Sequence, residues 1–296
     1  MQNRNWMKQN RNWGQYNAKL VERGSITFVV EEKTFKKIKN FKPRSTGGRP
    51  REYPLALIEL LLLIKVRYGL AYRELEGFAR SIFKGIEIPS YTIICRRAKE
   101  ISLPKLSHKR PSVVLLDASG IKVFGEGEWK RKIHGVGKPR KWLKLHIAVD
   151  ENSQQIVGEF LTDSRTADCT MVENLLQASG PSVKIVKADG AYNGASSWKS
   201  AERRGISLVS PPPKNARVRG RNKDRDDDVL IIQGLGGGAK GRRLWSKLKG
   251  YNYRALVETA FSRYKRLFGA QLSSRTFERQ VLENRLRWVI LNKMAA

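Results

Sequence analysis

The stretch SVVLLDASGIKVF, residues 112–124, decides the fold of this chain. Its valines, leucines and isoleucine are typical of a buried β-strand, and the chain changes there from helical to strand-like patterns. Segments 142–150 and 155–163 have the same character, and turn-forming residues bound each of them. Three consecutive strands predict an antiparallel meander at the start of a domain.

Beyond the meander, helical and strand patterns alternate. We predict, in order, a helix at 167–178, a strand at 183–188, a helix at 194–204, a strand at 206–210, and helices at 251–268 and 278–294. The resulting order, βββαβαβα followed by a closing helix, predicts an α/β domain with a mixed sheet. We place this domain at residues 111–296.

The composition points to a polyanionic partner. Lysine and arginine total 58 against 27 acidic residues, which gives a formal net charge of +31. Such an excess is costly in self-repulsion unless a polyanion neutralises it, and nucleic acid is the first candidate. A basic membrane-surface protein is the alternative, but we find no lipidation motif, and the most apolar run, Leu55 to Val66, is too short to cross a bilayer. We therefore expect a nucleic-acid-binding protein with no membrane partner. Because the polar start of the chain lacks the apolar core of a secretory signal, we expect it in the cytoplasm.

Charge also shapes the segment 211–250. It contains PPPK, many basic residues, the acidic run Asp226 to Asp228 and a glycine triplet at 236–238, with little apolar periodicity. We predict a long basic loop that faces DNA.

Residues 1–105 differ from the rest of the chain, with a polar arm followed by helical patterns at 55–68, 72–83 and 90–101. The short connection Lys84 to Pro89 fits a helix-turn-helix. Its last helix would carry Arg96, Arg97 and Lys99 toward DNA. The alternative, an ordinary helical bundle with a solvated basic face, stays open.

Three carboxylates stand out in the α/β domain. Asp117 follows a buried apolar run, where an unpaired carboxylate would be expensive. Asp189 follows the strand at 183–188, although Asp-Gly at that point could equally be a plain turn. Together with Glu258, on the helix at 251–268, they could converge on two Mg²⁺ ions, which prefer oxygen ligands.

Other metal ligands are scarce in the sequence. Cys95 and Cys169 form no metal-ligand spacing, and the chain has only 3 histidines. A catalytic metal would therefore have to be held by carboxylates.

The segment YNYRALVETAFSRYK, residues 251–265, places four polar side chains on one helical stripe. Tyr251, Arg254, Glu258 and Lys265 occupy relative positions 0, 3, 7 and 14. The opposite arc is apolar and consists of Leu256, Val257, Ala260, Phe261, Tyr264, Leu267 and Phe268. We expect the helix to pack on a core and to hold the polar stripe at its edge, with a merely salt-bridged rim as the alternative.

These four residues match the Y-x2-R-x3-E-x6-K signature of bacterial insertion-sequence transposases. The segments LLDASGIKVFGEGEW, WLKLHIAVD, LTDSRTAD, VKADGAY and SPPPKNARVR resemble, in the same order, the number-five insertion-sequence family. The resemblance spans about Asn12 to Met294.

The resemblance implies a ribonuclease-H-like catalytic domain and a DDE transposase. It assigns metal binding and catalysis to Asp117, Asp189 and Glu258, and contact with the DNA backbone to Tyr251, Arg254 and Lys265. The implied cofactor is Mg²⁺, with Mn²⁺ as a substitute. The implied partners are double-stranded DNA, as terminal inverted repeats and target, and further copies of the chain in a dimer or higher oligomer on DNA. The implied location is the bacterial cytoplasm, in association with the nucleoid.

Two other functions fit the same residues. A regulator or inactive remnant would keep the basic surface without chemistry. A stand-alone structure-selective nuclease would hydrolyse DNA without joining it or preferring the element ends.

Overall fold

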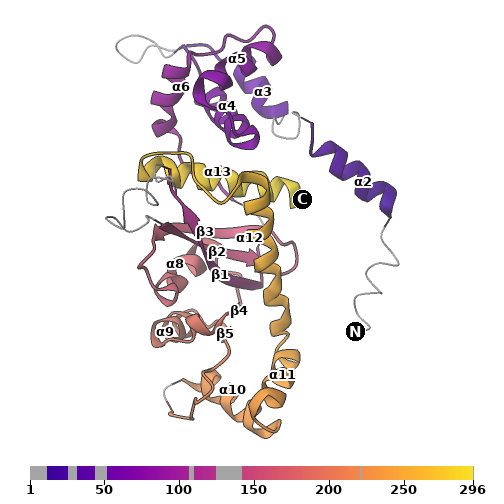
Figure 1. Ribbon diagram of the computed structural model, residues 1–296, viewed down its shortest axis with the longest axis vertical. Coiled ribbons are helices and arrows are strands. Elements are labelled where there is room, and N and C mark those ends of the chain that lie inside the picture. The colour runs from indigo at the N-terminus through magenta and orange to yellow at the C-terminus, as the bar shows by residue number, and fades with distance from the viewer. Residues whose placement is uncertain are drawn as a thin grey trace, which may run out of the picture. The chain divides into compact units, whose positions relative to one another are not determined.

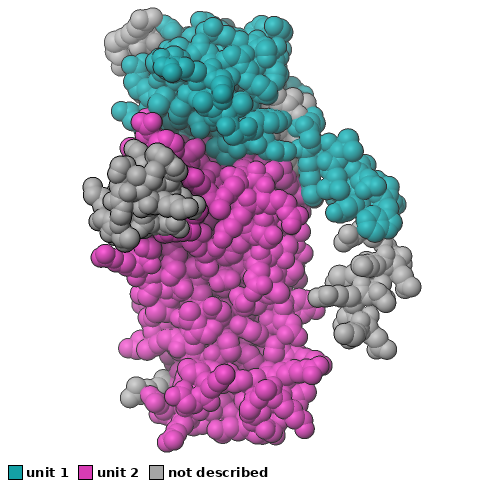
Figure 2. All heavy atoms as spheres, in the orientation of Figure 1, with its two compact units in different colours: residues 1–102 teal, residues 103–296 magenta. Residues whose placement is uncertain are grey.

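The computed structural model describes residues 12–25, 32–43, 52–106, 110–124, 142–220 and 222–295. The chain divides into two compact units, Met1–Ser102 and Leu103–Ala296, which Figure 2 shows in different colours. None of the helices in these described ranges is long and apolar enough to span a bilayer.

The first unit is helical. Its helices are α2 (Trp13–Glu22), α3 (Glu32–Lys39), α4 (Leu55–Tyr68), α5 (Tyr72–Ile82) and α6 (Tyr91–Arg97), and the 3₁₀ helix η2 (Ala98–Glu100) continues α6. Helix α4 starts after Pro54 and ends at Tyr68, and Gly69 caps it with a φ of 67°, in the left-handed region that glycine favours. Its leucines and isoleucines form the core against which α3, α5 and α6 pack. The predicted helical region is confirmed.

The second unit is built on one five-stranded sheet. Its strands are β1 (Val113–Lys122), β2 (Trp142–Asp150), β3 (Ile156–Asp163), β4 (Ile185–Ala188) and β5 (Ser207–Val209). Their order is β3-β2-β1-β4-β5, with antiparallel pairing among the first three and parallel pairing of β4 with β1 and β5. The predicted meander and the mixed sheet are confirmed.

Helices cover both faces of the sheet (Figure 1). On one face lie η3 (Asp168–Met171), α8 (Val172–Ser179), the short η4 (Gly190–Tyr192) and α9 (Ala195–Arg203), and on the other lie α12 (Ala255–Phe268) and α13 (Phe277–Ala295). Successive side chains of a strand point to opposite faces, so Val114 and Leu116 join the first core while Leu115 joins the second. This arrangement explains the continuous apolar run before Asp117, because a strand buried on both faces needs no polar alternation.

The prediction of a loop at 211–250 is wrong, because this segment contains the helices α10 (Lys223–Gly234) and α11 (Gly238–Leu248). They pack on each other around a small core of Val209, Ile232 and Trp245. The acidic run is used internally, since the indole of Trp245 donates to Asp228 at 2.9 Å. So few apolar side chains are buried here that the sequence carries little periodicity.

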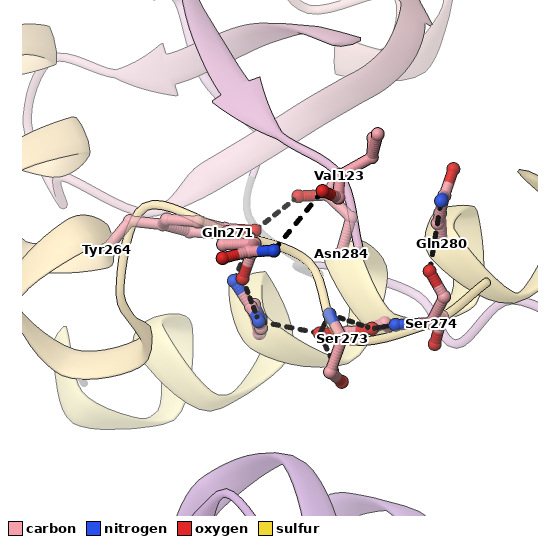
Figure 3. A network of polar contacts seen from close by, with 9 residues as sticks. Val123, Tyr264, Gln271, Ser273, Ser274, Gln280 and Asn284 are labelled. Carbon is pink, nitrogen blue, oxygen red and sulfur yellow. Dashed lines mark hydrogen bonds and ion pairs between the residues drawn. The ribbon is translucent and has the colours of Figure 1, made fainter. Parts of the chain in front are cut away.

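The connection between α12 and α13 is fastened to the end of β1 (Figure 3). Gln271 donates to the Val123 carbonyl at 3.2 Å, and Gln280 donates to the Ser274 carbonyl at 3.0 Å. The hydroxyl of Tyr264, on α12, donates to Asn284, on α13, at 2.9 Å. The first contact ties the connection to the end of β1, and the last joins α12 to α13.

Candidate active site

Two of the predicted carboxylates lie at one edge of the sheet because β1 and β4 are parallel neighbours. Leu116 pairs with Ala188, so the residues that follow them, Asp117 and Asp189, are brought together. Asp117 accepts a hydrogen bond from the Ala118 backbone at 2.8 Å. Asp189 caps η4 by accepting from the Ala191 backbone at 2.9 Å. The interpretation of Asp189 as a turn residue is therefore also supported, because its side chain caps η4. This contact is compatible with its position next to Asp117.

Arg254 supplies the compensation that the charge of Asp117 requires. Its Nη1 lies 3.0 Å from Oδ2 of Asp117, and its Nη2 lies 2.6 Å from Oε1 of Glu258. The side chains of Asp117 and Arg254 are 17% and 19% exposed, whereas that of Glu258 is 61% exposed. One guanidinium thus connects a carboxylate on the sheet with the exposed carboxylate on α12.

Burial and neighbouring charges shift the pKa values of both Asp117 and Arg254. Burial raises the pKa of Asp117, and the nearby Asp189 raises it further, while the Ala118 hydrogen bond and Arg254 oppose the rise. Burial lowers the pKa of Arg254, but the neighbouring Tyr251, Asp117 and Glu258 outweigh it, so the net direction is upward. Arg254 is a permanent cation among these carboxylates.

The predicted helix over 251–268 begins differently from expectation. Residues Tyr251–Arg254 form a 3₁₀ turn (η5) after Gly250, and the α-helix starts at Ala255. Tyr251 and Arg254 therefore lie on the preceding turn, and Glu258 and Lys265 lie on the α-helix. Burial raises the pKa of Tyr251, Arg254 lowers it, and Asp189 and Asp117 raise it. Tyr251 therefore lies close enough to these three residues to interact with their charges.

The rest of the stripe agrees with the sequence. Val257, Phe261 and Tyr264 are buried against the sheet, so the apolar arc is confirmed. On the polar side, Lys265 donates from Nζ to Oγ of Ser119 at 2.7 Å. Ser119 lies two residues beyond Asp117 on the same face of β1, and Lys265 therefore borders the same edge.

The donor chemistry of this site fits a hard divalent cation, because Asp117, Asp189 and Glu258 offer only oxygen. The geometry does not form a ready metal cage. No group of three or more His, Cys, Asp or Glu side chains within the described ranges is arranged to hold a metal ion. Instead, the guanidinium of Arg254 provides the positive charge between Asp117 and Glu258.

In the first unit, the prediction that Arg97 reaches toward DNA is wrong. Arg97 is 8% exposed, and its guanidinium donates to the Tyr53 carbonyl at 2.5 Å and to Glu100 at 3.2 Å. Its position on α6 faces the interior of the helical unit. Arg96 and Lys99 are exposed.

A buried cation beside the site was not predicted. Lys187 on β4 is 6% exposed and donates to Glu151 at 2.7 Å and to the Gly250 carbonyl at 3.0 Å. The available signal was a lysine within a short buried strand, two residues before Asp189, because a buried ammonium needs partners.

Comparison with known proteins gives a family match over both units. A family model described as "Transposase DDE domain" matches residues 108–293, and a second model with the same description matches residues 21–126. Neither description names the number-five insertion-sequence group, so that finer assignment stays a prediction.

Similar individual proteins are distant. An uncharacterized protein of Aquifex aeolicus (strain VF5) is 28% identical over 207 residues, which cover 60% of this chain and 61% of that protein's length. A piggyBac transposase synaptic complex with hairpin DNA shares 10% identity over 90% of this chain and 73% of that one, at a TM-score of 0.46. The Drosophila P element transposase strand transfer complex shares 13% identity over 91% of this chain and 70% of that one, at a TM-score of 0.34.

Proposed function

Because this chain belongs to the DDE transposase family, we propose that it is a transposase that binds the terminal inverted repeats of its own insertion sequence. It cleaves DNA at the element ends and joins the 3′ ends to target DNA by phosphoryl transfer. Cleavage and joining use the one site formed by Asp117, Asp189 and Glu258.

The observation that supports this proposal most directly is the link through Arg254. Asp117 and Asp189 lie close together because β1 and β4 are parallel neighbours. Arg254 connects Asp117 to Glu258 on α12. Three carboxylates from distant parts of the sequence thus border one partly open edge. Such oxygen ligands suit a metal-dependent phosphodiester chemistry.

The family uses divalent metal ions, and we propose Mg²⁺, with Mn²⁺ as a substitute, held by Asp117, Asp189 and Glu258. When bound, the metal supplies Lewis-acid activation for in-line displacement at phosphorus. The protein's own contribution is to fix the carboxylates and to place hydrogen-bond donors along the phosphate backbone at the element end. We assign that second role to Tyr251, Arg254 and Lys265, whose donors suit a phosphate backbone.

The first unit would hold the inverted repeats. Arg96 and Lys99 are exposed at the end of α6 and in η2, where they can meet phosphate. Two element ends must be held together during transposition, so we propose a dimer or higher oligomer assembled on DNA.

The test uses purified full-length chain, Mg²⁺ and a DNA fragment that carries the inverted repeats flanking its gene. Wild type is compared with Glu258→Gln, and with Glu278→Gln as a matched control at an exposed position on α13. We expect wild type and the control to nick and join at the repeats, whereas Glu258→Gln binds DNA without cutting it.

Each alternative function has its own outcome in this assay. Sequence-specific binding by wild type without nicking would replace the proposal with a DNA-binding regulator or inactive remnant. Cleavage without joining, or without preference for the repeats, would replace it with a stand-alone nuclease.

A further inference from the structure

We propose that Lys187 is a positioning residue for the phosphoryl transfer: its buried ammonium fixes the turn that carries Arg254 into the active site. This inference rests on the proposed function. It adds a residue that lies outside the carboxylate triad and the Y-x2-R-x3-E-x6-K signature.

Lys187 connects three segments that are far apart in the sequence. On β4 it pairs with Leu115 of β1, and its side chain leaves the sheet on the face opposite the core that holds Val186 and Ala188. There its Nζ donates to Oε2 of Glu151, just after β2, at 2.7 Å, and to the carbonyl of Gly250 at 3.0 Å.

The contact with Gly250 fixes the start of the η5 turn. Gly250 has a φ of 59°, in the left-handed region, and Tyr251–Arg254 follows it directly. A Cβ at Gly250 would lie 3.2 Å from Nζ of Lys187, so the glycine both allows the turn and leaves space for the ammonium. The ammonium also lies 5.3 Å from the ring centroid of Tyr253, within cation–π range.

A contribution to stability alone is a weak reason to bury such a group. Replacing a buried ion pair with apolar side chains is often neutral or stabilising, because desolvation offsets much of the attraction. What the pair does provide is a fixed geometry between the sheet edge and η5. Arg254 is the last residue of η5, and its contacts with Asp117 and Glu258 at 3.0 and 2.6 Å depend on where that turn lies.

The second unit contains a matched control for a purely structural anchor. Arg287 is also buried, donates to the carboxylate of Glu283 at 2.6 Å and to the carbonyl of Gln271 at 2.9 Å, and lies 5.5 Å from the ring centroid of Tyr264. It therefore joins a carboxylate, a carbonyl and an aromatic ring as Lys187 does. The carbonyl that it holds, that of Gln271, follows α12 in a segment with none of the proposed site residues, and Tyr264 lies on the buried apolar arc of α12 and not on its polar stripe.

The experiment compares full-length wild type, Lys187→Met, Lys187→Arg and Arg287→Met. Three quantities are measured: the thermal unfolding midpoint, the Kd for inverted-repeat DNA, and the single-turnover cleavage rate at saturating protein. We expect Lys187→Met to slow cleavage about 10- to 100-fold, the size that a small misplacement of a positioned group produces. Its Kd should stay within about two-fold of wild type. Lys187→Arg should recover much of the rate, and Arg287→Met should lower the unfolding midpoint without a comparable loss of cleavage.

Amide hydrogen exchange on the DNA-free protein gives a readout that does not need cleavage. Lys187→Met should speed exchange in peptides that cover 250–254, and Arg287→Met should speed exchange around 271–274 instead. Unchanged exchange at 250–254 in Lys187→Met would overturn the proposal. It would also be overturned if both Met variants lost cleavage in proportion to their loss of stability. If wild type cleaves no DNA, the proposed function fails, and hydrogen exchange alone decides whether Lys187 fixes the turn.

Discussion

Arg254 and Asp117, separated by 137 residues in the sequence, form an ion pair with a nitrogen–oxygen distance of 3.0 Å. The same guanidinium reaches Glu258 at 2.6 Å. A cation supplied by the chain therefore balances two of the three carboxylates to which we assign metal binding. Whether Arg254 and a divalent ion compete for these carboxylates can be measured directly.

Replacing Arg254 with Gln should lower stability when no divalent metal is present. Asp117 loses the neighbour that opposes its raised pKa, and a partly buried carboxylate is left without its charged partner, at a cost of about 1–3 kcal/mol. We expect Mg²⁺ or Mn²⁺ to stabilise Arg254→Gln more than wild type. Thermal unfolding with EDTA and with each metal measures this, and Arg266→Gln, exposed on the same helix, is the control. Equal stabilisation of wild type and variant would show that Arg254 does not balance the metal-binding carboxylates.

Lys265 should contribute one phosphate contact. Replacement by Gln should reduce the magnitude of the slope of log Kd against log salt concentration by about 0.9, the value for one neutralised phosphate on duplex DNA. Ser119→Ala removes the hydroxyl that accepts a hydrogen bond from Lys265 but leaves the charge of Lys265 in place. The slope for this variant should therefore stay close to that of wild type. A salt titration of binding to the inverted repeats separates the two. The assignment of Lys265 to DNA fails if its removal leaves the slope unchanged.

The three basic residues near the end of α6 should behave differently from one another. Arg96→Gln and Lys99→Gln should weaken binding to the inverted repeats without lowering the unfolding midpoint, because both side chains are exposed. Arg97→Gln should destabilise the helical unit by about 1–3 kcal/mol, because it removes the donor to the Tyr53 carbonyl and the ion pair with Glu100. Binding and thermal unfolding of each single variant test this. Equal loss of affinity in all three, with no loss of stability, would return Arg97 to the DNA surface.

His146 should make the stability depend on pH. It is buried on β2, with Nε2 2.9 Å from Oγ1 of Thr162 and Nδ1 3.5 Å from Oδ1 of Asp168. Burial lowers its pKa from 6.5 to about 4, Lys144 lowers it as well, and Asp168 opposes the change. Because the unfolded chain then takes up the proton first, this contribution to stability is complete above pH 6.5 and is lost as the pH falls toward 4.

The corresponding slope is at most about 1.4 kcal/mol per pH unit. We expect the free energy of unfolding of wild type to fall more steeply across this interval than that of His146→Gln, which cannot take up a proton. Denaturant unfolding at a series of pH values measures the difference. Parallel curves for the two proteins would mean that His146 does not titrate differently in the folded state.

The sequence by itself determined the elements whose side-chain pattern is repeated over many residues. The strands around Asp117 and the apolar arc of α12 are of this kind, since burial on one or both faces of an element is written directly into its residue types. The order of these elements also predicted the mixed sheet. That Asp117 and Asp189 converge was a hypothesis from their oxygen chemistry and from the family resemblance, and the pairing of β1 with β4 brings them together. Packing within 211–250 was not predictable in this way, because a core as small as that around Trp245 leaves too few apolar positions to form a pattern.

Only the tertiary structure decided which charges meet. The sequence placed Arg254 among residues that contact DNA, and the structure places its guanidinium between Asp117 and Glu258. It likewise turned Arg97 inward and joined Lys187 to Glu151 and Gly250. A local pattern records how strongly a residue prefers water or the interior. The partner of a buried charge, in contrast, is set by contacts between segments far apart in the chain, and those exist only once the chain has folded.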